Sequence, residues 1–190
     1  MLADMAYALV IAGKGGRRSE LARDVAAALT HRGLRVGGFT ERTAVSATGA
    51  KSLDLVRARD GTAVRLAGPA AGSADPAACS LSFDRRGFET ARRWIEEDAP
   101  SSDLLVLDGL GKLELGGEGH HAAIVRALAI APVVVLAIRD DQLVYALEAF
   151  GLSEPAASYA DGEGPGALDA FVAEVARLAG AAAPGRARAG

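Results

Sequence analysis

The sequence of 190 residues contains little cysteine, few aromatic residues and no long hydrophobic run. Its single cysteine, Cys79, cannot form an internal disulfide or a cysteine-rich metal site, which favours a reducing compartment. No histidine partner is fixed by the sequence, so Cys79 is a poor candidate nucleophile. The apolar run at residues 7–12 is too short to span a membrane, has no basic leader and follows Asp4. We interpret it as the first buried strand of a cytoplasmic protein without a membrane partner.

Strong charge of either sign is also missing. The formal net charge is −3, which argues against a general nucleic-acid binder, because such domains are usually strongly basic. Half of the residues are hydrophobic, and the length suits one domain with a substantial core. We therefore expect a single domain at residues 1–180 and a disordered tail at residues 181–190.

A turn rich in glycine and cations follows the first apolar run. A helix should begin at Ser19 as its N-cap and end before Gly33, and a strand should follow at residues 36–40. This βαβ unit implies a parallel sheet. Glycines let backbone N–H groups converge on an anion, which predicts phosphate binding; the alternative is a tight turn with exposed basic residues. The candidate binding residues are Gly13, Lys14, Gly15, Gly16, Arg17, Arg18 and Ser19.

The turn lacks the residues that make a phosphate loop catalytic. The usual pattern is G-x-x-x-x-G-K-[ST], in which the lysine contacts the outer phosphates and the hydroxyl binds magnesium. With Gly13 as the first glycine, the last three positions are Arg18, Ser19 and Glu20. The architecture of the loop is therefore present without its lysine and its hydroxyl.

The rest of the chain predicts a three-layer α/β sandwich. Its sheet should be mainly parallel, with an antiparallel hairpin around Asp60-Gly61 at about residues 52–67. Residues 68–82 and 153–166 should be loops. Further strands are expected at residues 104–107 and 132–138, and helices at residues 84–98, 140–150 and 167–178 and through Ile124 and Leu128. The arginines of the 84–98 helix are interleaved with acids, which indicates a solvated face rather than a phosphate patch.

Polar residues follow the strand at residues 104–107, and ligands of open parallel sheets bind beyond the carboxyl ends of strands. Asp108 ends this strand as a magnesium-orienting acid would, although it could instead cap the next turn. Lys112 and Glu114 could reach the same cleft or pair with each other. Asp108, Glu114 and Lys112 are the candidate catalytic residues. His120 and His121 are adjacent in a helix and point about 100° apart, so they are poor joint metal ligands, but one of them could line the cleft.

Three segments resemble the cancer-related nucleoside-triphosphatase family of small P-loop proteins. They are Ala-Gly-Lys-Gly-Gly at residues 12–16, Gly38-Phe39-Thr40-Glu41, and Leu-Asp-Gly-Leu-Gly-Lys-Leu-Glu-Leu at residues 107–115. The resemblance covers residues 9–150, and the glycines at 116–119 look closer to a bacterial branch often encoded beside molybdate-uptake genes. It implies a P-loop NTPase-like fold with Mg²⁺ held through water by Asp108 and no tightly bound organic cofactor.

The sequence departs from that family at three positions. Ser19 replaces the loop lysine, Glu20 the magnesium hydroxyl, and Gly109 the glutamate that could position water. Lys14 or Arg18 could supply the missing cation. We expect a degenerate P-loop protein that binds a nucleoside triphosphate or another phosphate-like oxyanion, with weak or no hydrolysis.

Two alternatives stay open at this stage. One is an active Mg²⁺-dependent ATPase or GTPase. The other is a non-enzymatic adaptor or regulatory subunit with a protein partner, for which the resemblance suggests molybdenum or molybdopterin metabolism. The sequence specifies neither the base, the partner nor the oligomeric state.

Overall fold

The computed structural model describes residues 6–69 and 81–182. Cys79 and most of the expected tail therefore lie outside the described residues. The strands are β1 Ala6–Ala12, β2 Val36–Val45, β3 Lys51–Arg57, β4 Ala63–Pro69, β5 Leu81–Phe83, β6 Leu104–Leu110, β7 Val133–Arg139 and β8 Ala157–Ala160. The helices are α1 Arg18–His31, α2 Arg85–Asp98, α3 Lys112–Leu115, α4 His121–Ile130, the 3-10 turn η1 Asp140–Gln142, α5 Leu143–Ala149 and α6 Ala167–Ala181.

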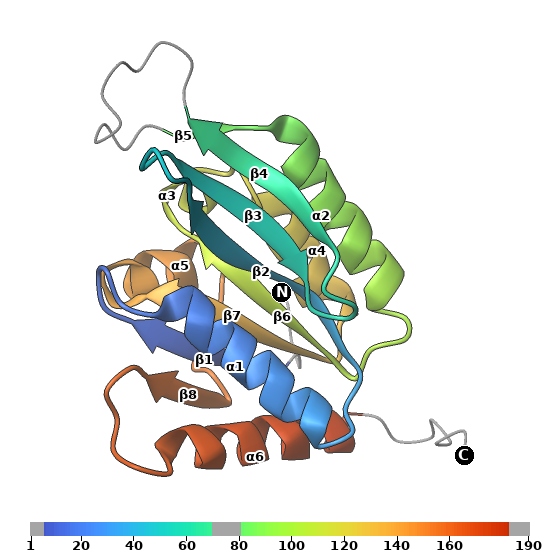
Figure 1. Ribbon diagram of the computed structural model, residues 1–190. Helices are drawn as coiled ribbons and strands as arrows, with labels where there is room; N and C mark the ends of the chain where they lie inside the picture. The colour runs from blue at the N-terminus through green and yellow to red at the C-terminus, as the bar shows by residue number, and fades with distance from the viewer. Residues whose placement is uncertain (1–5, 70–80, 183–190) are drawn as a thin grey trace.

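Within the described residues, eight strands form one sheet in the order β5-β4-β3-β2-β6-β7-β1-β8. From β2 to β8 the neighbouring strands are parallel, whereas β2, β3, β4 and β5 pair in antiparallel fashion. Helices cover both faces, with α1 and α6 on one side and α2 and α4 on the other (Figure 1). The expected α/β fold with a mainly parallel sheet and a hairpin is confirmed.

The structure corrects the expected loops in two places. Within residues 68–82, β4 extends to Pro69 and β5 adds a third antiparallel strand beyond the hairpin. Within residues 153–166, β8 pairs with β1 and buries Tyr159. Both added strands are very short, so neither contains enough residues to show a periodic apolar pattern.

Two hydrophobic cores explain why the central strands are apolar throughout. Leu105 and Leu107 pack under α2 and α4, whereas Leu104 and Val106 pack under α1 and α6. Successive side chains of a strand point to opposite faces, so a strand between two helical layers must be apolar at every position. The continuous apolar run at the start of β6 therefore reflects burial of the strand on both faces of the sheet.

Helix α1 begins two residues earlier than expected. Arg17 is the N-cap residue, no side chain caps the helix, and Ser19 is already the second helical residue. The expected N-cap at Ser19 is thus wrong, because the glycine turn leads directly into the helix. At the other end, Gly33 has a φ of +83° and follows the C-cap, as predicted. Helix α6 continues to Ala181, so the first residue of the expected tail is helical.

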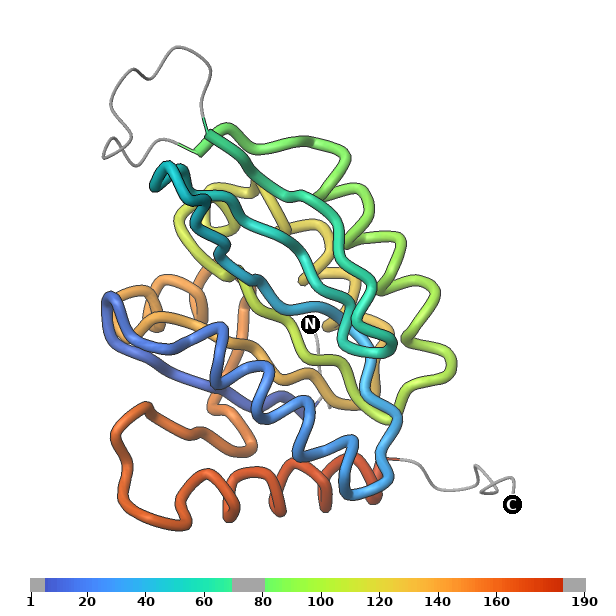
Figure 2. Tube along the Cα trace, viewed as in Figure 1, coloured from blue at the N-terminus to red at the C-terminus, as the bar shows by residue number. Residues whose placement is uncertain are grey.

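The sheet topology places the N-terminal end of α1 over the ends of neighbouring parallel strands. Between β1 and β2, helix α1 passes over β7 and β6, because both strands lie between them in the sheet. In Figure 2 the dark blue turn before α1 lies beside the orange turn that follows β7, where an added Cβ at Gly13 would be 3.7 Å from Asp140 Oδ2. The N-terminus of α1 therefore faces the carboxyl ends of β6 and β7.

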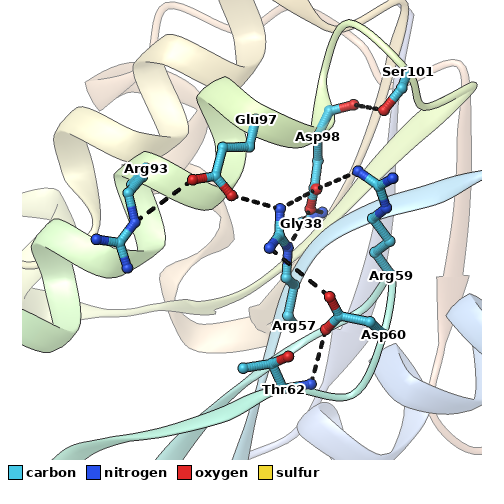
Figure 3. Close-up of polar contacts among 9 residues, drawn as sticks. All are labelled: Gly38, Arg57, Arg59, Asp60, Thr62, Arg93, Glu97, Asp98 and Ser101. Carbon is cyan, nitrogen blue, oxygen red and sulfur yellow. Dashed lines mark hydrogen bonds and ion pairs between the residues drawn. The ribbon is translucent and has the colours of Figure 1, made fainter.

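A buried carboxylate joins the antiparallel strands to the rest of the sheet. Asp98, at the end of α2, has no exposed side-chain surface and accepts hydrogen bonds from Arg57 Nη2 at 2.6 Å and from the Gly38 N–H at 3.2 Å (Figure 3). Arg57 also contacts the exposed carboxylate of Glu97 at 2.8 Å and lies over the ring of Trp94. These contacts connect β3, α2 and β2.

We predict that Asp98→Ala lowers the free energy of unfolding by about 3–5 kcal/mol, because it removes the buried partner of Arg57 and leaves the Gly38 N–H without its acceptor. The matched control is Glu97→Ala, which removes a carboxylate from the same Arg57 at a site that is 46% exposed. Exposed ion pairs contribute about 0–1 kcal/mol, so this control should change stability little. Urea unfolding of both variants measures the difference, and equal losses would refute a special role for Asp98.

Candidate functional site

The loop between β1 and α1 exposes backbone donors. Gly16 N–H donates to Gly13 O at 2.9 Å, and Gly15 adopts a φ of +80°, which favours glycine. The first N–H groups of a helix have no partner inside it, and no side chain caps those of α1. These donors, together with the positive end of the helix dipole, can bind an anion.

A cleft of about 360 Å³ lies at this loop. Five arginines and two glutamates line it, so its walls are mainly basic. The lining residues are Gly13, Gly15, Gly16, Arg17, Arg18, Ser19, Glu20, Arg23, Glu41, Arg42, Thr43 and Arg139. Lys14, which was expected to bind the anion, is exposed and is not part of this lining. Its positive charge instead helps to lower the pKa of Asp141.

Arg18, which lines the cleft, contacts two acids. Arg18 Nε lies 2.7 Å from Asp108 Oδ1, and Arg18 Nη2 donates to Glu41 Oε2 at 2.9 Å. The Arg18 side chain is 18% exposed, that of Glu41 11%, and that of Asp108 is completely buried. Arg18 therefore joins the start of α1 to β6 and β2.

Both oxygens of Asp108 have protein partners. Oδ1 contacts Arg18 and accepts the Gly109 N–H at 2.7 Å, and Oδ2 accepts the Glu41 N–H at 3.1 Å. The alternative that Asp108 caps the following turn thus describes part of its role. The acid expected to orient Mg²⁺ through water is here the counter-ion of an arginine.

Burial and neighbouring charge shift the acid–base properties of this group. Burial first, and then the negative charge of Asp108, raise the pKa of Glu41 to about 8. Burial alone would lower the pKa of Arg18, but Asp108 and Glu41 outweigh it and the net shift is upward. Near neutral pH Glu41 is therefore largely protonated beside the Arg18 guanidinium.

The buried ring of His120 lies beside the cluster. Its ring is 1% exposed and lies between Phe39 and Phe88, at centroid distances of 4.6 and 4.8 Å. Neither ring nitrogen has a hydrogen-bond partner among the described residues, and Nε2 lies 3.9 Å from Glu41 Oε1. Burial lowers the pKa of His120 to about 4, so the ring is neutral.

The second histidine points elsewhere. His121 stacks on Phe150 at 4.9 Å, and its Nδ1 lies 2.7 Å from the carbonyl oxygen of Glu114. The two histidine rings thus have separate surroundings, as their adjacent positions predicted. No group of three histidine, cysteine, aspartate or glutamate residues suited to a metal ion occurs in the part of the chain that the structure describes.

Gly109 has a steric reason to be glycine. Its φ is +93°, and an added Cβ would lie 2.5 Å from Glu41 Oε1 and 3.1 Å from the His120 ring. A glutamate at this position would therefore collide with the cluster beneath it. The absence of a water-positioning side chain at Gly109 is thus linked to the burial of Glu41, because the Glu41 carboxylate occupies the space that such a side chain would need.

Among the described residues, Lys112 and Glu114 neither line the cleft nor pair with each other, which were the two alternatives that the sequence left open. Glu114 is buried and accepts the Gly111 N–H and the His120 N–H, both at 2.9 Å. It therefore holds the glycine-rich segment in place. Lys112 is exposed at the start of α3 and, like Lys14, helps to lower the pKa of Asp141. Neither residue lines the cleft.

The sequence reasoning did not assign a site role to Glu41, Arg23, Arg42 or Arg139. A signal existed for Glu41 and Arg139, since each follows an apolar run of its strand on the side where ligands bind parallel sheets. Arg23 donates to Glu41 O at 3.2 Å from the second turn of α1, and nothing local in the sequence indicates that contact.

Comparison with known proteins gives one family and one solved structure. A family model described as "Protein of unknown function (DUF2478)" matches residues 7–156. The solution structure of a human cancer-related nucleoside triphosphatase is similar, with a TM-score of 0.51 and 16% identity over 90% of this chain and 84% of the other. No curated protein matches. The structural match confirms the P-loop NTPase-like fold. No described helix is long and apolar enough to cross a membrane.

We predict that stability falls as the pH rises from about 6.5 to 8. In this window Glu41 is ionised in the unfolded protein, whereas it stays largely protonated in the folded protein until the pH reaches its pKa of about 8. The folded state therefore binds more protons than the unfolded state, and the free energy of unfolding falls as the pH rises. The lowered pKa of His120 makes the free energy of unfolding depend on pH only between about 4 and 6.5, where acid destabilises the fold. His120 therefore does not contribute to the loss above pH 6.5. The loss should reach at most about 2 kcal/mol. Urea unfolding should show a flat profile for Glu41→Gln, which keeps an acceptor for Arg18; an unchanged slope would contradict the assignment.

Proposed function

The chain belongs to the DUF2478 family, and we propose that it binds a phosphate-like oxyanion, free or on a nucleotide, at residues 13–19. We further propose that it hydrolyses nucleoside triphosphates weakly or not at all. The observation that carries the proposal is the uncapped N-terminus of α1, which opens with the glycine turn into a cleft lined by five arginines.

The outer arginines support binding because their partners are weak or exposed. Arg17 lies 3.9 Å from both Glu20 and Asp161, and Arg42 contacts Asp54 while 52% exposed. Exposed pairs of this kind contribute little, so an anion can replace these partners. Guanidinium groups also match the geometry of phosphate oxygens.

The inner residues support slow or absent hydrolysis. Phosphoryl transfer depends on a phosphate cation, a metal and a residue that positions water. Ser19 and Glu20 replace the first two contributions, and Gly109 cannot carry a side chain without displacing Glu41. Arg18 is a cation near the loop, but its guanidinium is directed to Asp108 and Glu41.

The active ATPase or GTPase and the non-enzymatic adaptor remain the competing functions. A role in molybdenum metabolism stays a prediction from the resemblance. Molybdate and tungstate are tetrahedral oxyanions like phosphate, so the same loop could bind them. A ligand series that includes these anions separates the alternatives.

We predict that ATP, GTP, their diphosphates, phosphate or molybdate raises the melting temperature. A ligand at 100 times its Kd adds about 2.7 kcal/mol, which corresponds to roughly 5–10 °C for a domain of this size. The double variant Arg17→Ala/Arg23→Ala should reduce this shift, because it removes two cations from the cleft. The control Arg85→Ala/Arg93→Ala removes the same charge from the exposed face of α2. No shift with any ligand would support the adaptor instead.

We also predict no Mg²⁺-dependent phosphate release from ATP or GTP above the rate in buffer. A coupled phosphate assay at saturating nucleotide measures this directly. Rapid release that disappears in Asp108→Asn, while that variant keeps the wild-type circular dichroism spectrum, would establish the active nucleoside triphosphatase and refute the degenerate loop.

A further inference from the structure

We propose that this loop binds its oxyanion without a divalent cation, because the Arg18 guanidinium already neutralises the carboxylate that would hold one. The inference rests on the proposed function and specifies its ligand: a tetrahedral oxyanion group that is not chelated by metal. Inorganic phosphate, molybdate and the terminal phosphate of a nucleotide share this chemistry.

The first argument is the set of oxygen donors beside the loop. Mg²⁺ is usually bound through one or two carboxylates and its own waters, in near-octahedral geometry. Asp108 has no exposed surface, and its two oxygens already contact Arg18 and the N–H groups of Gly109 and Glu41. A cation could use this carboxylate only by displacing Arg18, so the residues present do not fit Mg²⁺.

The second argument is the position that normally supplies a hydroxyl to the metal. Glu20 occupies it, with a side chain that is 56% exposed and 3.9 Å from Arg17. Glu41, the remaining carboxylate of the cleft, accepts from Arg18 Nη2 at 2.9 Å. Both buried acids therefore contact the same guanidinium.

The third argument concerns the charge that the ligand meets. In a P-loop, a lysine and a metal balance the phosphates and the nearby acid. Here Arg18 balances Asp108 internally, and the surface arginines Arg17, Arg23 and Arg42 remain for the ligand. Like charges repel strongly where water is excluded, so an unpaired Asp108 would oppose a bound anion. The arginine thus removes the need for a metal.

Isothermal titration with ADP and with inorganic phosphate, each in EDTA and in millimolar Mg²⁺, tests the proposal on the full chain. We expect the Kd of phosphate to agree within about twofold in the two buffers. ADP should bind as tightly in EDTA as in Mg²⁺, or more tightly, because Mg²⁺ reduces the charge of the nucleotide. Binding of phosphate alone would assign an inorganic oxyanion, and binding of ADP alone a nucleotide.

Two substitutions at one position provide the sharper comparison. Arg18→Gly restores the glycine of the usual pattern and leaves Asp108 without its counter-ion. It should weaken binding in EDTA by roughly tenfold or more, and Mg²⁺ should restore much of the affinity. The matched variant Arg18→Lys keeps the positive charge and should remain independent of Mg²⁺. Circular dichroism and melting curves establish that each variant is folded.

The possible outcomes separate this inference from the proposed function. Wild-type binding that requires Mg²⁺ would overturn the metal-free site while leaving oxyanion binding intact. No binding in either buffer would overturn both. If Arg18→Gly does not fold, the wild-type titrations together with Arg18→Lys still decide, because a metal requirement in either protein contradicts the proposal.

Discussion

The arrangement of the cleft depends on the buried ion pair between Arg18 and Asp108. Without it, Asp108 would be an uncompensated carboxylate with no exposed surface, which is costly in a protein interior. The pair also explains neighbouring features. Glu41 contacts the same guanidinium, Gly109 leaves room for the Glu41 carboxylate, and the buried His120 ring lies beside that carboxylate. Arg18 in the glycine loop thus fits together with residues on β2 and β6.

This arrangement clarifies how the chain relates to P-loop proteins. The fold and the glycine turn are present, and the helix still presents its N-terminus toward the strand ends. The charges around them are distributed differently, because Ser19 and Glu20 stand where the usual loop has a lysine and a hydroxyl, and Arg18 contacts Asp108. Fold and chemistry can therefore diverge within one scaffold, since the fold depends on the two apolar cores and the chemistry on a few polar positions.

The sequence predicted the features that have a strong local pattern. The apolar run of β6, the hairpin at Asp60-Gly61 and the glycine after α1 each have one physical interpretation, and the structure confirms them. Asp108 could be placed at a strand end by the same reasoning. The direction of the Arg18 side chain could not be predicted, because it depends on acids that lie 23 and 90 residues further along the chain. Short strands such as β8 lack a pattern altogether.

Strand β2 joins the parallel and antiparallel parts of the sheet, and its outer half, from Arg42 to Val45, is exposed. Side-chain alternation therefore specifies its register weakly. Two buried aspartates compensate: Asp98 accepts the N–H of Gly38, and Asp108 accepts that of Glu41. These backbone clamps, three residues apart, would have to break before the strand could slide by one position. The buried acid that contacts Arg18 thus also helps to fix the register of β2 where the parallel and antiparallel parts of the sheet meet.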